Sequence, residues 1–445
     1  MNKRLLSAVL ATAMGVTGLA GCARPGASDR SGTSDVSDGE EIAEILPSEG
    51  TVIIRSEPVE KSIRDLSATE ESDYRQGYLD FTFNLLNGWL AQHGTDSNAM
   101  VSPASVMLAL DMAASGAAGD TLTQITGLYG GASDPQGQLS YAAGMMERLN
   151  DPSREGVSMH VANSMWINSE IMGDDIKQDY IDFVQSYFDA EEERTVFDSN
   201  ACGRINGWVN DKTDGMIPTI IDDLDPLMAM MLINAIAFDG SWASQYEESQ
   251  VTDGTFTSAS GAAQDATMLT STESTYLEND IATGFVKYYE GYDYAFVVML
   301  PKDESMDAGQ LLASFDGTMF DEYMNSATTE YDVNAQIPEF SYDCGDSIKS
   351  LLGDLGMNAP FHNADFSGMA EDGLGYYIGD VVHKTFIEVS RTGTRAAAVT
   401  AVMLYRNAID IAKESKEVIC DRPFAYAIVD MNDNTPVFIG TVNEV

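Results

Sequence analysis

The side chains that most often carry out chemistry are scattered along this chain. The four histidines stand far apart in the sequence, at His93, His160, His362 and His383. The chain contains no Gly-x-Ser-x-Gly elbow, no His-Glu-x-x-His pair, no P-loop and no Gly-x-Gly-x-x-Gly turn. Residues 430–434 lack the glycine and the terminal glutamate of a calcium loop. A hydrolytic site would have to be assembled from distant segments, so the sequence favours no enzyme, no cofactor and no metal.

One segment near the C-terminus is unusually rich in small and β-branched residues: Gly393 to Ala401 reads GTRAAAVTA. Thr and Val favour strand geometry and Ala permits it. Because side chains alternate along a strand, one face would carry only small ones, from Thr394, Ala396, Ala398 and Thr400. Such a strand could slide into a narrow gap in an existing sheet. A small-residue linker or the start of a helix is the alternative.

The first half of the chain has the periodicity of helices. Apolar residues recur at helical spacing between about residues 73 and 92, which predicts an amphipathic helix. Ser102 can cap a second helix that starts at Pro103. That helix is apolar nearly all round, so we expect it to be buried, and Gly116 and Gly119 should end it.

The second half is dominated by apolar runs that predict buried strands. These runs are residues 227–238, 294–300, 424–429 and 437–440, and residues 430–434 between the last two form a hairpin-like turn. A further helix is expected from Asp346 to Leu355, with Gly356 as its stop. Helices first and strands later predict one α+β domain with sheets buried on both faces.

The chain is strongly acidic. It has 24 Lys and Arg against 70 Asp and Glu, a formal net charge of −46. This excess repels phosphates and anionic head groups, so we exclude nucleic acid as a partner and expect no polyanion activator. We attribute the acidity to the general composition of the source organism, with a specific basic partner as the alternative.

The N-terminus has the features of a targeting signal. Basic residues at Lys3 and Arg4 precede an apolar stretch that ends in Leu19-Ala20-Gly21-Cys22, which resembles the bacterial lipobox. We expect a signal peptide over residues 1–21 and, over residues 22–59, lipidated Cys22 and a flexible acidic tether. The protein would then be held by its lipid on the extracellular side of the bacterial membrane. Ordinary secretion is the alternative.

Three thiols follow Cys22, at Cys202, Cys344 and Cys420. They are widely spaced and odd in number, so they form no CxxC pair and no disulfide framework. We expect buried structural thiols.

Several short motifs, each weak alone, occur in a specific order along residues 60–445. Together they resemble the serpin family. They are Asn98–Ser105 (NAMVSPAS) with Gly116-Ala117 and Gly119-Asp120-Thr121, Asn234–Trp242 (NAIAFDGSW), Ile337–Phe340 (IPEF), Leu355-Gly356-Met357, His383–Val389 (HKTFIEV), Arg422-Pro423-Phe424 and Phe438-Ile439-Gly440.

The resemblance implies a single serpin-like α+β domain over residues 60–445. It implies a helical N-terminal half, a large central mixed β-sheet, smaller sheets and an exposed reactive-centre loop. It also implies a monomeric inhibitor of serine proteases, not an enzyme, that acts as a suicide substrate. The protease cleaves the loop and is acylated, and the freed loop inserts into the central sheet with the protease still attached. The native state would be metastable.

The resemblance also assigns residues to this mechanism. The loop hinge is Gly393, Thr394, Arg395, Ala396, Ala397 and Ala398, and Gly393 can give it backbone freedom. The region where the sheet must part comprises Ser102, Ser105, Asn234, Trp242 and His383. A polar cluster there could exchange hydrogen bonds between two states. His383 alone could equally be a satisfied core histidine.

The hinge departs from the family pattern at three positions. Arg391 and Arg395 replace the usual acidic residues two before and two after Gly393, and Val399 replaces a smaller residue. We expect both arginines to lie on an outward face, where they need not block insertion but could change its rate.

The bait window is Tyr405, Arg406, Asn407 and Ala408. Family spacing places the cut near Asn407, but the segment before Arg422 is longer than usual, so the register is open by one or more residues. Cleavage after Arg406 suits a trypsin-like protease and cleavage after Tyr405 a chymotrypsin-like one. We favour Arg406, because charge complementarity discriminates strongly.

Two other hypotheses remain at this stage. One is a non-inhibitory serpin-like binding protein on the cell surface, whose loop does not insert. The other is a hydrolytic lipoprotein with a site assembled from distant residues.

Overall fold

A computed structural model describes residues 63–154, 156–371, 373, 375–394 and 413–445 of the chain. Several predicted features lie outside these ranges: the signal and tether with Cys22, the hinge residues Arg395 to Ala398, and the bait window from Tyr405 to Ala408. The part that is described has the predicted α+β fold, with a helical N-terminal half followed by most of the strands.

The helices begin where the sequence offers capping side chains. The Ser67 hydroxyl accepts a hydrogen bond from the Glu70 amide and the Glu70 carboxylate accepts one from the Ser67 amide, which fixes the start of α1 (Ala68–His93). Ser102 caps α2 (Pro103–Gly116), as predicted. The other helices are α3 (Gly119–Gly127), α4 (Pro135–Leu149), α5 (Gln178–Phe188), α6 (Ser199–Lys212), α7 (Ala308–Ala313), α8 (Gly317–Asn325), α9 (Lys349–Asp354) and α10 (Ala359–His362), with short 3₁₀ turns at Gly131–Ser133 and Glu248–Gln250.

A mixed six-stranded sheet, here called the central sheet, is the element on which the site is built. Its strands follow the order β11-β12-β13-β4-β2-β3. All neighbours are antiparallel except β2 and β3, which are parallel. The bounds are β11 (Phe340–Ser347), β12 (Val382–Val389), β13 (Gly393–Thr394), β4 (Met230–Ser241), β2 (Val157–Asn168) and β3 (Ala190–Thr195).

Two further sheets complete the domain. The first has the order β1-β16-β15-β9-β8-β7, and the second has the order β14-β10-β6-β5, with β14 parallel to β10. The bounds are β1 (Ala99–Val101), β16 (Thr435–Val442), β15 (Phe424–Asp430), β9 (Tyr294–Pro301), β8 (Ala282–Tyr288), β7 (Tyr276–Glu278), β14 (Glu414–Ile419), β10 (Tyr331–Pro338), β6 (Ala263–Glu273) and β5 (Val251–Thr257).

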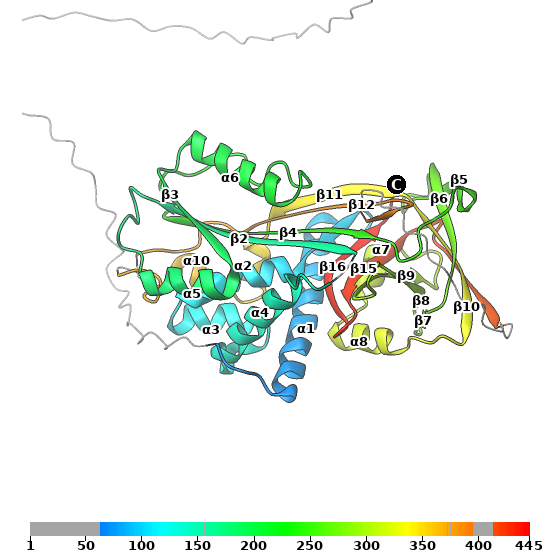
Figure 1. Cartoon of the computed structure of the whole chain (residues 1–445), viewed down its shortest axis with the longest axis horizontal. Helices are drawn as coiled ribbons and strands as arrows, with labels where there is room; N and C mark the ends of the chain where they lie inside the picture. Colours follow the sequence, from blue (N-terminus) through cyan, green and yellow to red (C-terminus); the bar gives the residue numbers. More distant parts are fainter. Residues whose placement is uncertain (1–62, 155, 372, 374, 395–412) are drawn as a thin grey trace, which may run out of the picture. The chain divides into compact units, whose positions relative to one another are not determined.

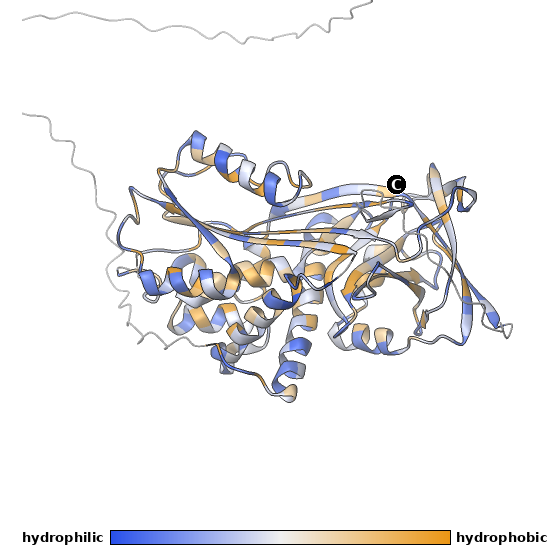
Figure 2. Ribbon diagram, viewed as in Figure 1, coloured by the Kyte–Doolittle hydropathy of each residue, from blue (hydrophilic) through white to orange (hydrophobic). Residues whose placement is uncertain are grey.

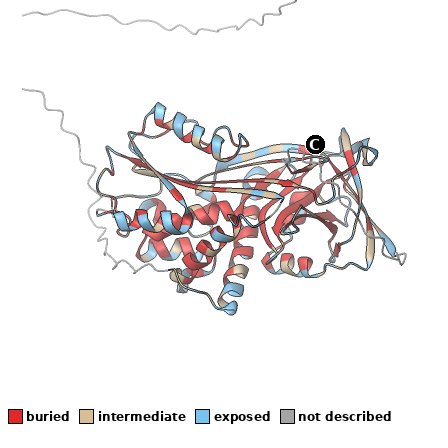
Figure 3. Cartoon of the chain, viewed as in Figure 1, coloured by how far each residue is buried: buried red, intermediate tan, exposed pale blue. Residues whose placement is uncertain are grey.

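Helices cover both faces of the central sheet. α2 and α4 lie on one side of β2 and β4, and α6 lies on the other (Figure 1). α2 is buried almost all round, as its apolar sequence predicts, whereas α6 exposes a hydrophilic outer surface (Figures 2 and 3). Beneath α6 a separate apolar cluster forms from Ile205 and Val209 of the helix and Ile233 of β4. The central sheet is therefore held between two apolar layers.

Two local predictions need correction. The helix expected from Asp346 begins only at Lys349, because Asp346 and Ser347 still belong to β11, where they pair with His383 and Val382. Tertiary pairing overrides the local helical pattern here.

The thiols also differ from expectation, because only Cys420 is buried, while Cys202 and Cys344 are partly exposed and all three are unpaired. Partial burial still raises the pKa of the Cys344 thiol to about 11.

Within the ranges that the structure covers, no helix is long and apolar enough to cross a membrane.

Candidate functional site

The central sheet has an incomplete strand position between β4 and β12, here called the slot. β13 occupies its upper end with only two residues, pairing with β12 on one side and β4 on the other. Among the described residues, β4 and β12 form no ladder with each other below β13. Farther along, a cavity of about 140 Å³ lies between residues 228–234, at the start of β4, and residues 376–383, which lead into β12.

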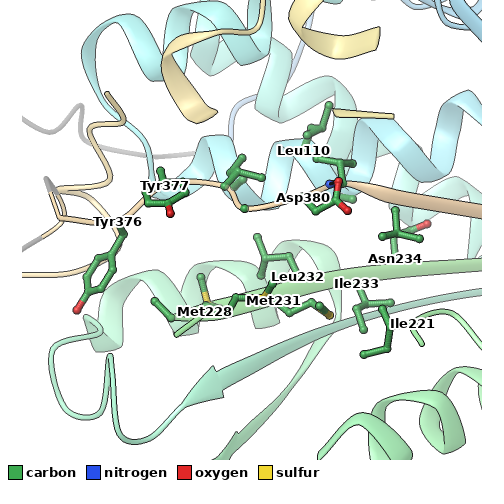
Figure 4. Close-up of a pocket in the computed structure, with 18 of the residues that line it drawn as sticks. Leu110, Ile221, Met228, Met231, Leu232, Ile233, Asn234, Tyr376, Tyr377 and Asp380 are labelled. Carbon is green, nitrogen blue, oxygen red and sulfur yellow. Dashed lines mark hydrogen bonds between the residues drawn. The ribbon is translucent and has the colours of Figure 1, made fainter. Parts of the chain in front are cut away.

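The cavity is lined mainly by apolar side chains. β4 contributes Met230 to Asn234, and α2 contributes Leu110 and Ala113 from beneath. Residues 376–380, which lead into β12, form the opposite wall, and Figure 4 shows them facing the segment from Met228 to Asn234. An unfilled apolar space loses van der Waals contacts on every side, so a strand carrying small apolar side chains would gain free energy by entering it.

A hydroxyl pair holds the upper end of the slot. Thr394 is only 2% exposed, and its Oγ1 lies 2.6 Å from the hydroxyl of Tyr289. The Tyr289 ring stacks on Trp242, with ring centroids 4.6 Å apart. The Trp242 indole nitrogen in turn donates to the Ser390 carbonyl at 2.9 Å. Trp242, from the predicted sheet-opening set, therefore contacts the turn that leads into β13.

The turn before β13 is anchored as well. Its ends exchange backbone hydrogen bonds between Ser390 and Gly393. The Arg391 amide donates to Oε1 of Glu339 at 2.9 Å, while the Arg391 side chain is exposed as predicted. Gly393 and Thr394, the first two residues of the predicted hinge, are both buried. They are buried because both residues pair with β4, and Thr394 also pairs with β12.

A polar cluster lies beside the cavity, at the other end of the slot. The Ser102 amide donates to Nε2 of His383 at 3.1 Å, and the Ser102 hydroxyl accepts from the Ser105 amide and donates to the Val437 carbonyl. His383 is 4% exposed, and burial lowers its pKa to about 4. The ring is therefore neutral at physiological pH, and its Nε2 accepts the hydrogen bond from the Ser102 amide.

Asn234 belongs to the same cluster. Its amide nitrogen donates to Oδ1 of Asn163 at 2.8 Å, and Asn163 donates to the Phe188 carbonyl. The Asn234 Oδ1 atom is buried without a hydrogen-bond partner in the described structure, beside the cavity that the residue lines. An unpaired buried carbonyl destabilises the state that contains it.

The structure thus divides the predicted sheet-opening residues into two groups. Ser102, Ser105, Asn234 and His383 gather around the cavity. Trp242 stands apart from them, because it follows Asn234 by eight residues along an extended strand, a separation of about 26 Å. The two groups mark the two ends of the slot.

Three important residues carried no signal in the sequence. Tyr289 and Asn163 lie in segments without a motif, and only folding brings them to Thr394 and Asn234. Lys287 is 2% exposed beneath Trp242 and Tyr246, where its Nζ lies 2.8 Å from Oε1 of Glu273. Its charge is buried only because a carboxylate pairs with it.

In the parts of the chain that are described, no group of three or more His, Cys, Asp or Glu side chains is placed to hold a metal ion.

Comparison with known proteins gives one consistent result. A family model described as serpin (serine protease inhibitor) matches residues 76–445. An uncharacterized serpin-like protein of Thermococcus kodakarensis is 30% identical over 365 residues, which cover 81% of this chain and 83% of that protein. The native-state crystal structure of tengpin, a thermophilic serpin, is 34% identical with a TM-score of 0.74, covering 88% of this chain and 98% of tengpin. Human thyroxine-binding globulin shares the fold at 24% identity, with a TM-score of 0.74 and coverage of 84% and 99%.

We expect His383 to make the stability of the fold fall in mild acid. Its pKa is about 4 in the folded protein against 6.5 ordinarily, so between these values the unfolded chain binds a proton that the folded chain does not. The neutral ring therefore contributes to the free energy of unfolding. This contribution is complete above pH 6.5 and is lost as the pH falls, by about 2 kcal/mol at pH 5. Denaturant unfolding at pH 5 and pH 7 measures it. His383→Gln can still accept a hydrogen bond from the Ser102 amide but does not titrate, and an unchanged pH dependence in this variant would contradict the prediction.

We expect Tyr289→Phe to loosen the hinge. The change leaves the buried Thr394 hydroxyl without its partner, which should favour opening of β13 by about 1 kcal/mol, or roughly fivefold. Hydrogen exchange of a peptide covering residues 390–394 reports this opening. Tyr294→Phe is the control, because Tyr294 is equally buried and makes no hydrogen bond to the hinge among the described contacts. Equal exchange in the two variants would show that the hydroxyl pair does not hold the hinge.

Proposed function

Because the chain belongs to the serpin family, we propose that it inhibits serine proteases as a suicide substrate. Members of this family are in general protease inhibitors and not catalytic enzymes. The segment between β13 and β14, residues 395–413, carries the bait. A protease that attacks it forms an acyl-enzyme. The freed segment then extends β13 down the slot, and the protease remains covalently attached to the moving end.

The observation that carries this proposal is the partly occupied slot. β13 already pairs with β12 on one side and β4 on the other at the upper end of the slot. Insertion therefore has to extend an existing strand and does not have to start a new one. Below it lie an apolar cavity and the unpaired oxygen of Asn234. Each residue that enters would gain hydrogen bonds to two neighbouring strands and bury its side chain.

The composition of the entering segment supports insertion. From Thr394 onward every second residue is small as far as Thr400, and Thr394 itself already points into the core toward Tyr289. A charged or bulky residue at Thr394 would have to displace the packed rings of Tyr289 and Trp242. The chain has no such obstacle at this position.

We propose a trypsin-like target, cut after Arg406. An arginine before the cut would meet an acidic specificity pocket, which discriminates strongly by charge. Cleavage after Tyr405 by a chymotrypsin-like protease is the nearest alternative.

A non-inhibitory binding protein is the second candidate function. The fold alone does not exclude it, since thyroxine-binding globulin has the same fold. The two functions differ in one physical consequence. Insertion of a cleaved loop adds a central strand and raises the melting temperature, whereas a loop that does not insert leaves the melting temperature unchanged.

We also propose that Cys22 is lipidated and holds the protein on the extracellular side of the bacterial membrane, with secretion as the alternative. The proposal rests on the basic start, the apolar stretch and the small residues before Cys22. A single lipidated cysteine and a polar tether would leave the domain free to meet proteases outside the cell.

We expect trypsin to be trapped in a complex that survives a denaturing gel, with the new chain end after Arg406 identified by mass spectrometry. Protein nicked in the loop should melt about 10 °C or more above the intact protein, because a central strand has been added. Thr394→Arg is the matched control, because it places a charge against Tyr289 at the entrance to the slot. This variant should be cut at the same bond without trapping the protease. Cleavage of the unchanged protein with neither a complex nor a higher melting temperature would contradict inhibition.

We expect Cys22→Ala to release the protein from the membrane. In a bacterial expression host, the unchanged protein should incorporate labelled palmitate and sediment with membranes, and the variant should do neither. Cys202→Ala is the control, because it removes a thiol from the folded domain and leaves the N-terminal signal intact. Equal labelling of all three proteins would contradict lipidation at Cys22.

A further inference from the structure

The three sheets meet at one buried ion pair. Lys287 lies on β8 and Glu273 on β6, and these strands belong to two different sheets. The two side chains are 2% and 14% exposed, and the Lys287 Nζ atom lies 2.8 Å from Oε1 of Glu273. The same ammonium also contacts the chain that follows β4, the strand beside the slot in the central sheet. A change at this pair can therefore reach the slot directly.

The chain that follows β4 comprises residues 242–246 and is here called the post-β4 segment. After Trp242 it belongs to no helix or strand, so no backbone ladder fixes its shape. The Lys287 ammonium donates to the Ser244 carbonyl at 3.2 Å. It also lies over the rings of Trp242 and Tyr246, 5.5 and 4.2 Å from their centroids. The post-β4 segment is thus held by one buried cation, which both rings attract.

The post-β4 segment in turn holds the turn that leads into β13. The Trp242 amide donates to the Thr392 carbonyl at 3.0 Å, and the Trp242 indole donates to the Ser390 carbonyl at 2.9 Å. The Tyr246 amide donates to the Arg391 carbonyl at 3.0 Å. Three consecutive carbonyls of the turn therefore accept hydrogen bonds from the two residues whose rings the ammonium contacts.

We propose that Lys287 is a positioning residue for the hinge. Paired with Glu273, it fixes the post-β4 segment, and the hydrogen bonds of that segment keep the turn and β13 in the slot. Glu273 is itself oriented, because its Oε1 atom also accepts from the Ser271 hydroxyl at 2.6 Å. The inference concerns the closed hinge of the intact protein, so it does not depend on whether a protease is trapped.

Global stability alone gives little reason for a charged pair at this place. Burying an ammonium and a carboxylate costs free energy, and apolar residues of similar volume often stabilise a fold as well as a buried ion pair does. An apolar residue at Lys287 could fill the space. It could not supply a donor for the Ser244 carbonyl or a positive charge for the two rings.

The test measures hydrogen exchange of the full-length protein. In Lys287→Met, peptides covering residues 242–246 and 390–394 should both exchange about tenfold faster, because the post-β4 segment loses its hydrogen bond and both cation contacts. This variant also leaves the Glu273 carboxylate buried without its cation, which destabilises the whole fold. A second variant is therefore needed to separate the local effect from the global one.

The double variant Lys287→Met with Glu273→Met provides this separation. It removes both charges together, so it should unfold at the same denaturant concentration as the unchanged protein. Exchange of the peptide covering residues 390–394 should nevertheless stay about tenfold faster, because the donor to Ser244 and the charge on the rings are still missing. A role confined to global stability would be restored in this variant, whereas a positioning role would not.

Arg154→Met is the matched control. Arg154 and Asp430 form a second buried ion pair, with side chains 10% and 4% exposed. The Arg154 guanidinium also lies over a ring, 4.8 Å from the centroid of Tyr294. Among the described contacts, this pair touches neither the post-β4 segment nor the turn. Its loss should destabilise the fold without singling out the peptide that covers residues 390–394.

Three results would each overturn the proposal. The first is a double variant whose hinge peptide exchanges as slowly as in the unchanged protein. The second is an Arg154→Met variant that accelerates this peptide as much as Lys287→Met does. The third needs no variant: in the unchanged protein the two peptides should open to within about threefold of each other, and a turn that opens far more often than the post-β4 segment is not held by it. Failure to trap a protease would contradict the proposed function and leave this inference standing.

Discussion

The described structure depends on one constraint, the slot between β4 and β12 in the central sheet. Two strands that flank a missing neighbour leave backbone groups and apolar side chains without partners. The fold accepts this arrangement because α2 and α6 hold the sheet from both faces (Figure 1). The hinge anchored by Tyr289 and Trp242 closes one end, and the cluster around His383 marks the other.

The buried polar groups beside the slot are only partly satisfied by hydrogen bonds. The cluster at its lower end holds a neutral histidine and an asparagine with one unpaired oxygen, so its hydrogen bonding is incomplete in this state. Incomplete hydrogen bonding in a low dielectric is energetically expensive.

Much of the fold could be predicted from local pattern, and the failures have physical causes. α1, α2 and the hairpin of β15 and β16 were predicted because their caps, periodicity and turn residues are all local. The helix expected from Asp346 begins three residues late, because pairing with β12 extends β11 into it. Cys344 was expected to be buried, but its strand lies at the edge of the central sheet, where one side has no covering strand.

The sequence by itself determined the family and the small-residue segment after Gly393, and it singled out Ser102, Ser105, Asn234, Trp242 and His383 as candidates. Those signals are carried by residue type and order, which need no coordinates. Only the tertiary structure decided that Thr394 is already buried, that Trp242 stands apart from His383, and that Tyr289 and Asn163 belong to the site. It also decided the register by which Gly393 and Thr394 pair with β4 and Thr394 pairs with β12. The reason is that strand register is a relation between segments about 150 residues apart in the chain, and neither segment encodes its partner alone.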